Sequence, residues 1–74
     1  MGDKYIVLEM QTNVDGTVAT LTNSYSTIEE AYNKYYTVLA YAAISTLPCH
    51  SAALTTNKGM LYESKCFEHP LLEE

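Results

Sequence analysis

The sequence predicts an α+β fold, a two-layer ββαββ sandwich in which a four-stranded antiparallel sheet carries one helix on one face. Three observations lead to this prediction. Two strand-like segments flank a turn at Gly16, two more flank a turn at Gly59, and one long helical pattern separates the pairs. The 74 residues suit a single domain, expected over residues 1–69, with residues 70–74 as a flexible C-terminal tail.

The first predicted hairpin joins strands at residues 5–12 and 17–23. Between them, Asn13-Val14-Asp15-Gly16 is typical of a tight turn, because glycine accepts a positive φ. Side chains alternate between the two faces of a strand, so every second residue shares a face. The residues expected to face the helix from this hairpin are Ile6, Leu8, Met10, Ala19 and Leu21.

The predicted helix begins at Ser26 or Thr27 and ends near Leu47. Either residue forms a capping-box pattern with a glutamate three positions later. Pro48 ends the helix, because the residue before a proline is pushed out of the helical region. The stripe expected to cover the sheet is Ile28, Ala31, Tyr32, Tyr35, Val38, Leu39, Ala42 and Thr46.

The second predicted hairpin joins strands at residues 50–56 and 60–68 through the turn Asn57-Lys58-Gly59. Thr56 opposite Met60 places His50 opposite Cys66 on the same face. The residues expected to face the helix are Ala52, Leu54, Tyr62 and Cys66. The order of the four strands in space stays open.

The composition excludes several classes of protein. Nine acidic residues against four lysines give a net charge of −5, and arginine is absent, so direct nucleic-acid binding is not expected. The longest apolar stretch, residues 38–44, is too short to cross a membrane. The start of the chain does not resemble a signal peptide. We therefore expect a cytoplasmic protein without membrane association, whose two cysteines are free thiols.

The predicted fold leaves more apolar surface than it covers. Residues 38–44 of the helix are apolar nearly all round, and a single sheet covers only one side of a helix. The outer sheet face is expected to carry Tyr5, Val7, Val18, Ala53, Leu61 and Phe67 beside Glu9, Glu63 and Lys65. The predicted interface is a second helix ridge, Tyr36, Ala40, Tyr41, Ala43, Ile44 and Leu47. We expect a homo-oligomer, with a dimer favoured; alternatively, the alanines only favour helix formation.

Four of the seven tyrosines lie on the predicted helix, at positions 32, 35, 36 and 41. Stacked tyrosines hold planar, nucleotide-like ligands in some proteins. Tyrosine also suits the edge of a thin core, where its hydroxyl reaches water. We favour the core and rim interpretation and assign no ligand-binding residue.

Two cysteines and two histidines form the only group with the potential for chemistry: Cys49, His50, Cys66 and His69. Together they offer a zinc ligand set, but the spacing matches no known zinc motif. A thiolate paired with His50 is a candidate nucleophile, but the sequence indicates no carboxylate that would orient the histidine. A Cys49–Cys66 disulfide is disfavoured, because the predicted register points the two side chains to opposite faces. We expect no metal, no cofactor and no enzymatic activity.

Four segments, residues 4–13, 15–18, 31–40 and 43–52, resemble small prophage-encoded proteins of Firmicutes that have no assigned activity. The resemblance implies a phage or prophage accessory role in the cytoplasm of a bacterial host. One such role is counter-defence, by inhibiting a host defence protein or by sequestering a small nucleotide signal. Another is a virion structural accessory protein. The apolar helix ridge predicts a second copy of the chain as one partner. The resemblance adds a host protein or a small nucleotide as a further expected partner.

Overall fold

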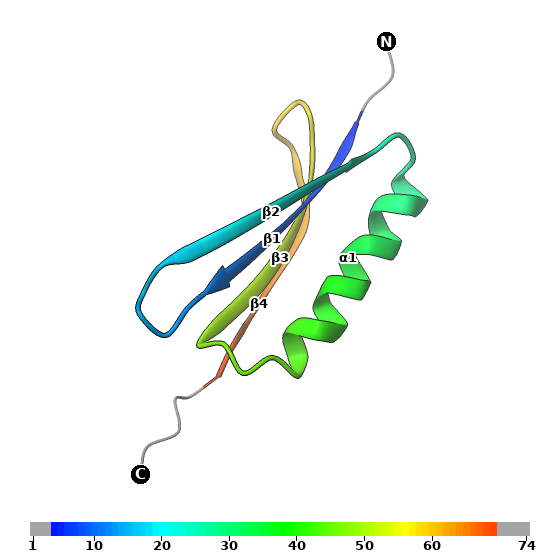
Figure 1. Cartoon of the computed structure of the whole chain (residues 1–74). Coiled ribbons are helices and arrows are strands. Elements are labelled where there is room, and N and C mark those ends of the chain that lie inside the picture. The colour runs from blue at the N-terminus through cyan, green and yellow to red at the C-terminus, as the bar shows by residue number, and fades with distance from the viewer. Residues whose placement is uncertain (1–3, 70–74) are drawn as a thin grey trace.

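The computed structural model describes residues 4–69 and confirms the α+β fold. The elements are β1 (Tyr5–Thr12), β2 (Val18–Tyr25), α1 (Ile28–Ala43), β3 (Cys49–Thr56) and β4 (Leu61–Glu68). The four strands form one antiparallel sheet in the order β2-β1-β3-β4, and α1 runs along one of its faces (Figure 1). No helix in the described part of the chain is both long and apolar enough to span a membrane.

The two hairpins close through turns of the same kind. The backbone N–H of Asn13 donates to Thr17 O at 2.8 Å, and that of Thr56 donates to Met60 O at 2.9 Å. Gly16 and Gly59 end the loops with φ of 92° and 84°, which side-chain-bearing residues rarely adopt. The predicted turns are therefore confirmed at both positions.

Helix α1 begins at the Thr27 cap and ends earlier than predicted. The Thr27 hydroxyl accepts from the Glu30 backbone N–H at 3.3 Å and donates to the Glu30 carboxylate at 3.0 Å. At the other end, the helix stops at Ala43 with Ile44 as its cap, four residues before the predicted end at Leu47. Pro48 restricts only the residue before it, and the chain needs residues 44–48 to turn back into β3.

Replacing Thr27 by alanine tests this cap. We expect Thr27→Ala to lower the free energy of unfolding by about 1 kcal/mol, because the Glu30 N–H loses its acceptor. Ser26→Ala is the matched control and is expected to change stability by less than about 0.5 kcal/mol. Urea denaturation followed by circular dichroism measures both. Equal losses at the two positions would contradict the assignment of Thr27 as the cap.

The core lies between α1 and the two central strands. Its buried members are Val7, Ala31, Tyr35, Val38, Ala52 and Leu54. The helix stripe predicted from the sequence is confirmed at its centre, where Ala31, Tyr35, Val38 and Ala42 are buried. The predicted face of β1 is wrong, because Val7 points toward the helix and Ile6, Leu8 and Met10 point away from it.

The pairing of β1 with its neighbours explains this reversal. Val7 lies opposite Leu54, and Glu9 lies opposite both Ala52 and Leu21. Residues directly opposite in an antiparallel pair share a face, so Ala52 and Leu54 bring the odd-numbered residues of β1 toward the helix. Tyr5, Val7 and Glu9 were expected on the outer face and lie on the helix side instead.

A register shift in the second hairpin corrects a further prediction. Thr56 does lie opposite Met60, but an irregularity between Leu54 and Thr55 inserts one extra residue into β4. His50 therefore lies opposite Phe67, and Cys66 lies opposite Ser51 on the outer face. As a result, Phe67, Glu63 and Lys65 move to the helix side, contrary to expectation.

Candidate functional site

The sheet face opposite α1 has no other part of residues 4–69 packed against it (Figure 1). We call it the outer face. Its residues are Ile6, Leu8, Met10 and Thr12 of β1, Val18, Thr20, Thr22 and Ser24 of β2, Cys49, Ser51, Ala53 and Thr55 of β3, and Leu61, Ser64, Cys66 and Glu68 of β4. Apolar side chains thus occupy the middle of an uncovered sheet.

Charge is distributed between the two sheet faces in an unusual way. Among these outer-face residues, Glu68 at the end of β4 is the one charged side chain. Glu9, Glu63 and Lys65 lie on the covered side. Glu9 bonds His50, the Glu63 carboxylate raises the pKa of Tyr32, and the Lys65 ammonium lies 5.3 Å from the Phe67 ring centre. An uncovered face is ordinarily the more polar one. Here the uncovered face carries less charge than the covered face.

The helix ridge predicted as an interface is exposed as expected. Tyr36, Tyr41 and Ile44 are 55%, 64% and 79% exposed, and Ala40 and Ala43 are also exposed, whereas Leu47 is half-buried. The ridge frames a shallow hollow of about 490 Å³. Its lining residues are Asn33, Tyr36, Thr37, Ala40, Tyr41 and Ile44. The chain therefore presents a second apolar surface on the opposite side of the molecule.

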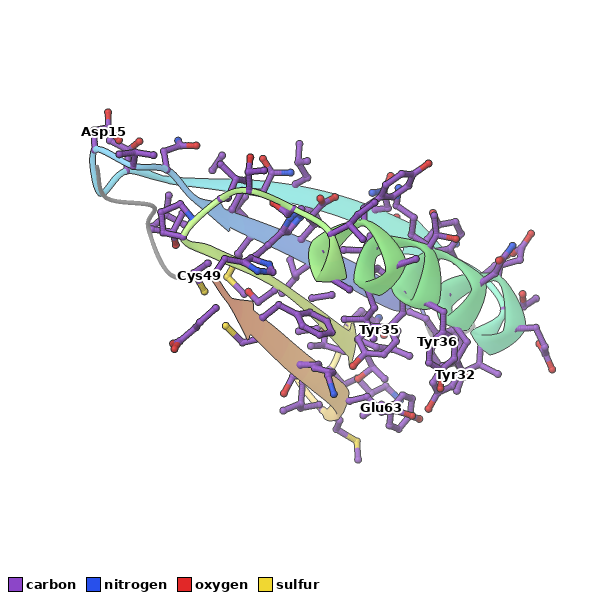
Figure 2. All side chains as sticks on the ribbon, turned by 90° about the horizontal axis from the view of Figure 1, so that it is seen from below. Asp15, Tyr32, Tyr35, Tyr36, Cys49 and Glu63 are labelled. Atoms are coloured by element: carbon purple, nitrogen blue, oxygen red, sulfur yellow. The ribbon has the colours of Figure 1, made fainter. Side chains whose placement is uncertain are left out.

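Three of the four helix tyrosines, Tyr32, Tyr35 and Tyr36, pack on one another beside Glu63 (Figure 2). Tyr32 and Tyr36 stack with ring centres 5.8 Å apart, and the buried Tyr35 makes an edge-to-face contact with each of them. A hydrogen bond to the Glu63 carboxylate raises the pKa of Tyr32, and burial raises the pKa of Tyr35. Because these rings already contact one another, the arrangement supports the core and rim interpretation.

A carboxylate–imidazole pair lies under the helix. The Glu9 Oε2 atom is 2.7 Å from His50 Nε2 and accepts a second bond from Gln11 Nε2 at 2.9 Å. The two side chains are 13% and 6% exposed, and His50 Nδ1 is buried without a partner. Burial raises the pKa of Glu9, but bonds from His50 and Gln11 and the charges of His50 and Lys34 outweigh it, so the net pKa is lowered. Sequence reasoning missed this pair, because it placed Glu9 on the other face.

The four candidate ligands Cys49, His50, Cys66 and His69 do not converge on one point. His50 lies on the helix side with Glu9, and the ring of His69 bonds Ala42 O at 2.9 Å. Cys49 and Cys66 share the outer face, where their sulfurs lie 2.9 Å apart. The expectation that these cysteines point to opposite faces is therefore wrong. Within residues 4–69, no three His, Cys, Asp or Glu side chains are grouped to hold a metal ion.

Comparisons of this chain with protein-family models, with curated proteins and with solved structures found no match.

Proposed function

We propose that this chain is a small binding protein that acts as a homodimer, in which two copies stack the outer faces of their sheets. The observation that supports the proposal is the near absence of charge on that face, where Glu68 is the one charged residue among the strand residues that form it. Two sheets packed face to face leave about 10 Å between them, filled by side chains of both inner faces.

The charge of the chain favours a second copy as the occupant. Two copies that each carry a net charge of −5 repel one another wherever acidic surfaces meet. Stable contact between them therefore needs a surface almost free of charge, which the outer face supplies. A basic partner is less favoured, because Glu68 is the only acidic side chain among the described strand residues of this face.

The size of the outer face also suits a dimer. Each strand has eight residues. Four such strands cover about 27 Å by 19 Å, or about 500 Å² in projection. Side-chain relief makes the accessible area larger than this projection, so it approaches the roughly 800 Å² that each partner buries in a stable complex.

In such a dimer the two helices lie on the outside, so the helix ridge stays accessible to another partner. The more specific roles implied by the resemblance to prophage proteins, counter-defence or a virion accessory function, stay predictions. So do the absence of enzymatic activity and the absence of direct nucleic-acid binding.

Lysine substitutions on each surface test the proposal. Leu8→Lys places a charge in the middle of the outer face, and Thr22→Lys places one at the exposed residue opposite Leu8. Ile44→Lys is the matched control on the helix ridge. We expect the wild-type chain to form a dimer. The dimerisation affinity is expected to fall by about a hundredfold or more in the two outer-face variants, because buried like charges oppose stacking, and to stay unchanged in Ile44→Lys.

Sedimentation equilibrium over a concentration series measures these affinities, and circular dichroism checks that each variant is folded. If Leu8→Lys fails to fold, Thr22→Lys still tests the outer face, because Thr22 is exposed within one subunit and a lysine there does not disturb the core. A wild-type monomer at millimolar concentration would overturn the proposal. Dissociation by Ile44→Lys alone would instead place the interface on the helix ridge predicted from the sequence.

A further inference from the structure

Cys49 and Cys66 form a close pair of thiols at one end of the outer face. Cys49 is the first residue of β3, and Cys66 lies opposite Ser51 on β4, so the two are diagonal neighbours across the strand pair. Their sulfurs share a hydrogen bond of 2.9 Å, and neither cysteine is in a disulfide. Cys66 is exposed and Cys49 is half-buried, so small molecules in solution reach the pair.

We propose that Cys49 and Cys66 form a reversible redox site, which closes to an intramolecular disulfide by exchange with a small-molecule disulfide such as oxidised glutathione. A disulfide bond is about 2.05 Å long, so the two sulfurs need to approach by about 0.9 Å. Both cysteines belong to the same subunit, so closure of the bond needs no second copy. Because they lie on the outer face, which the proposed dimer covers, the exchange takes place in the free subunit.

The exchange takes place in two steps. The Cys49 thiolate attacks one sulfur of the external disulfide, whose S–S bond breaks and releases one small thiolate, leaving a mixed disulfide on Cys49. The Cys66 thiolate then attacks Cys49 Sγ and displaces the second small thiolate. The two protein thiols lose two electrons and two protons, and the external disulfide is reduced to two small thiols.

The surroundings of Cys66 set the order of attack. The hydrogen bond to Cys49, burial, and the negative charges of Cys49 and Glu68 raise the pKa of Cys66 from 9.0 to about 11. The thiolate population of Cys66 near neutral pH is therefore smaller than it would be at the ordinary pKa. Cys66 is thus the poorer first nucleophile. Once Cys49 is in the mixed disulfide, its hydrogen bond and charge no longer hold the Cys66 proton, and Cys66 becomes able to attack.

The position of the pair favours a bond that is easily reduced. Diagonal neighbours in an antiparallel pair lie farther apart than residues directly opposite, so closure strains the strand ends. Strained or exposed disulfides have more oxidising potentials than structural ones and serve as reversible sites.

Intact-mass spectrometry of the full chain with oxidised glutathione tests the site. We expect the mass of the reduced chain to fall by two hydrogen atoms and the product to remain a single chain on a non-reducing gel. Adding dithiothreitol is expected to restore the original mass. In Cys66→Ser the second step is blocked, so a stable glutathione adduct on Cys49 is expected. Persistent adducts on both cysteines of the wild type, disulfides between chains, or no reaction would each overturn the proposal.

Alkylation tests the order of attack separately. With less than one equivalent of iodoacetamide near pH 8, peptide mapping is expected to find Cys49 modified at least about tenfold more than Cys66. Exposure alone predicts the opposite, because Cys66 is the more exposed thiol. Preferential modification of Cys66 would therefore reject Cys49 as the first nucleophile.

Discussion

Replacing Leu54 by alanine is expected to lower the free energy of unfolding by about 2–5 kcal/mol. Leu54 is fully buried in the central strand β3, opposite Val7 on one side and Glu63 on the other, and belongs to the core beneath α1. Small domains bury a limited fraction of their surface and have stabilities near the low end of about 5–15 kcal/mol. The variant is therefore expected to be largely unfolded near 37 °C.

Leu21→Ala is the matched control, with the same substitution on the same side of the sheet. Leu21 lies on the edge strand β2 and is 50% exposed, so its loss is expected to cost less than about 1 kcal/mol. Urea denaturation of both variants, at equal protein concentration, measures the difference. Similar losses in the two variants would contradict a core centred on β1 and β3.

Removing the Glu9 carboxylate is expected to have the second largest effect. Glu9→Ala leaves the buried His50 Nε2 and the amide of Gln11 without their acceptor. Since His50 Nδ1 already has no partner, the imidazole then has no hydrogen bond among the described residues. A buried polar group that loses its partner costs about 1–3 kcal/mol, which is the expected loss of stability. Urea denaturation near neutral pH measures it.

The same pair makes stability depend on pH. The pKa of Glu9 is lower in the folded chain than its ordinary value, because bonds from His50 and Gln11 with the charges of His50 and Lys34 outweigh burial. The stabilisation that results from this lowered pKa is fully present at pH values above the ordinary pKa of glutamate. It is lost as the pH falls through the lowered pKa of Glu9 in the folded chain. We expect the wild-type advantage over Glu9→Gln to shrink below about pH 4. An advantage that stays constant down to pH 2 would show that Glu9 is not stabilised in its ionised form.

Local sequence signals were sufficient to place the elements. Strand β1 has the predicted limits, and the other strands differ by one or two residues at their ends. The turns at Gly16 and Gly59, the Thr27 cap and the buried helix stripe are also confirmed. Each of these features depends on residues close together in the chain, such as a glycine with positive φ or a cap three residues before a glutamate.

The covered faces of β2 and β3 were predicted correctly, with Leu21, Ala52 and Leu54 on the helix side, but the covered face of β1 was not. In β1 the even-numbered residues Ile6, Leu8 and Met10 are more apolar than the odd-numbered set, which contains Glu9 and Gln11. Hydrophobicity therefore favoured the wrong face. The structure reverses it, because Val7 pairs with Leu54 and the Glu9 carboxylate finds a partner in His50. A more apolar face directed away from the helix is the feature that leads us to propose the dimer.

The sequence by itself determined the number and order of the elements and, apart from the end of α1, their approximate limits, since these follow from short-range periodicity, turn residues and caps. Tertiary pairing alone decided which side of β1 and of most of β4 is covered, and it brought Cys49 beside Cys66 and Glu9 beside His50. The physical reason is that side chains alternate along a strand, so one extra residue in β4 transfers every later side chain to the opposite face.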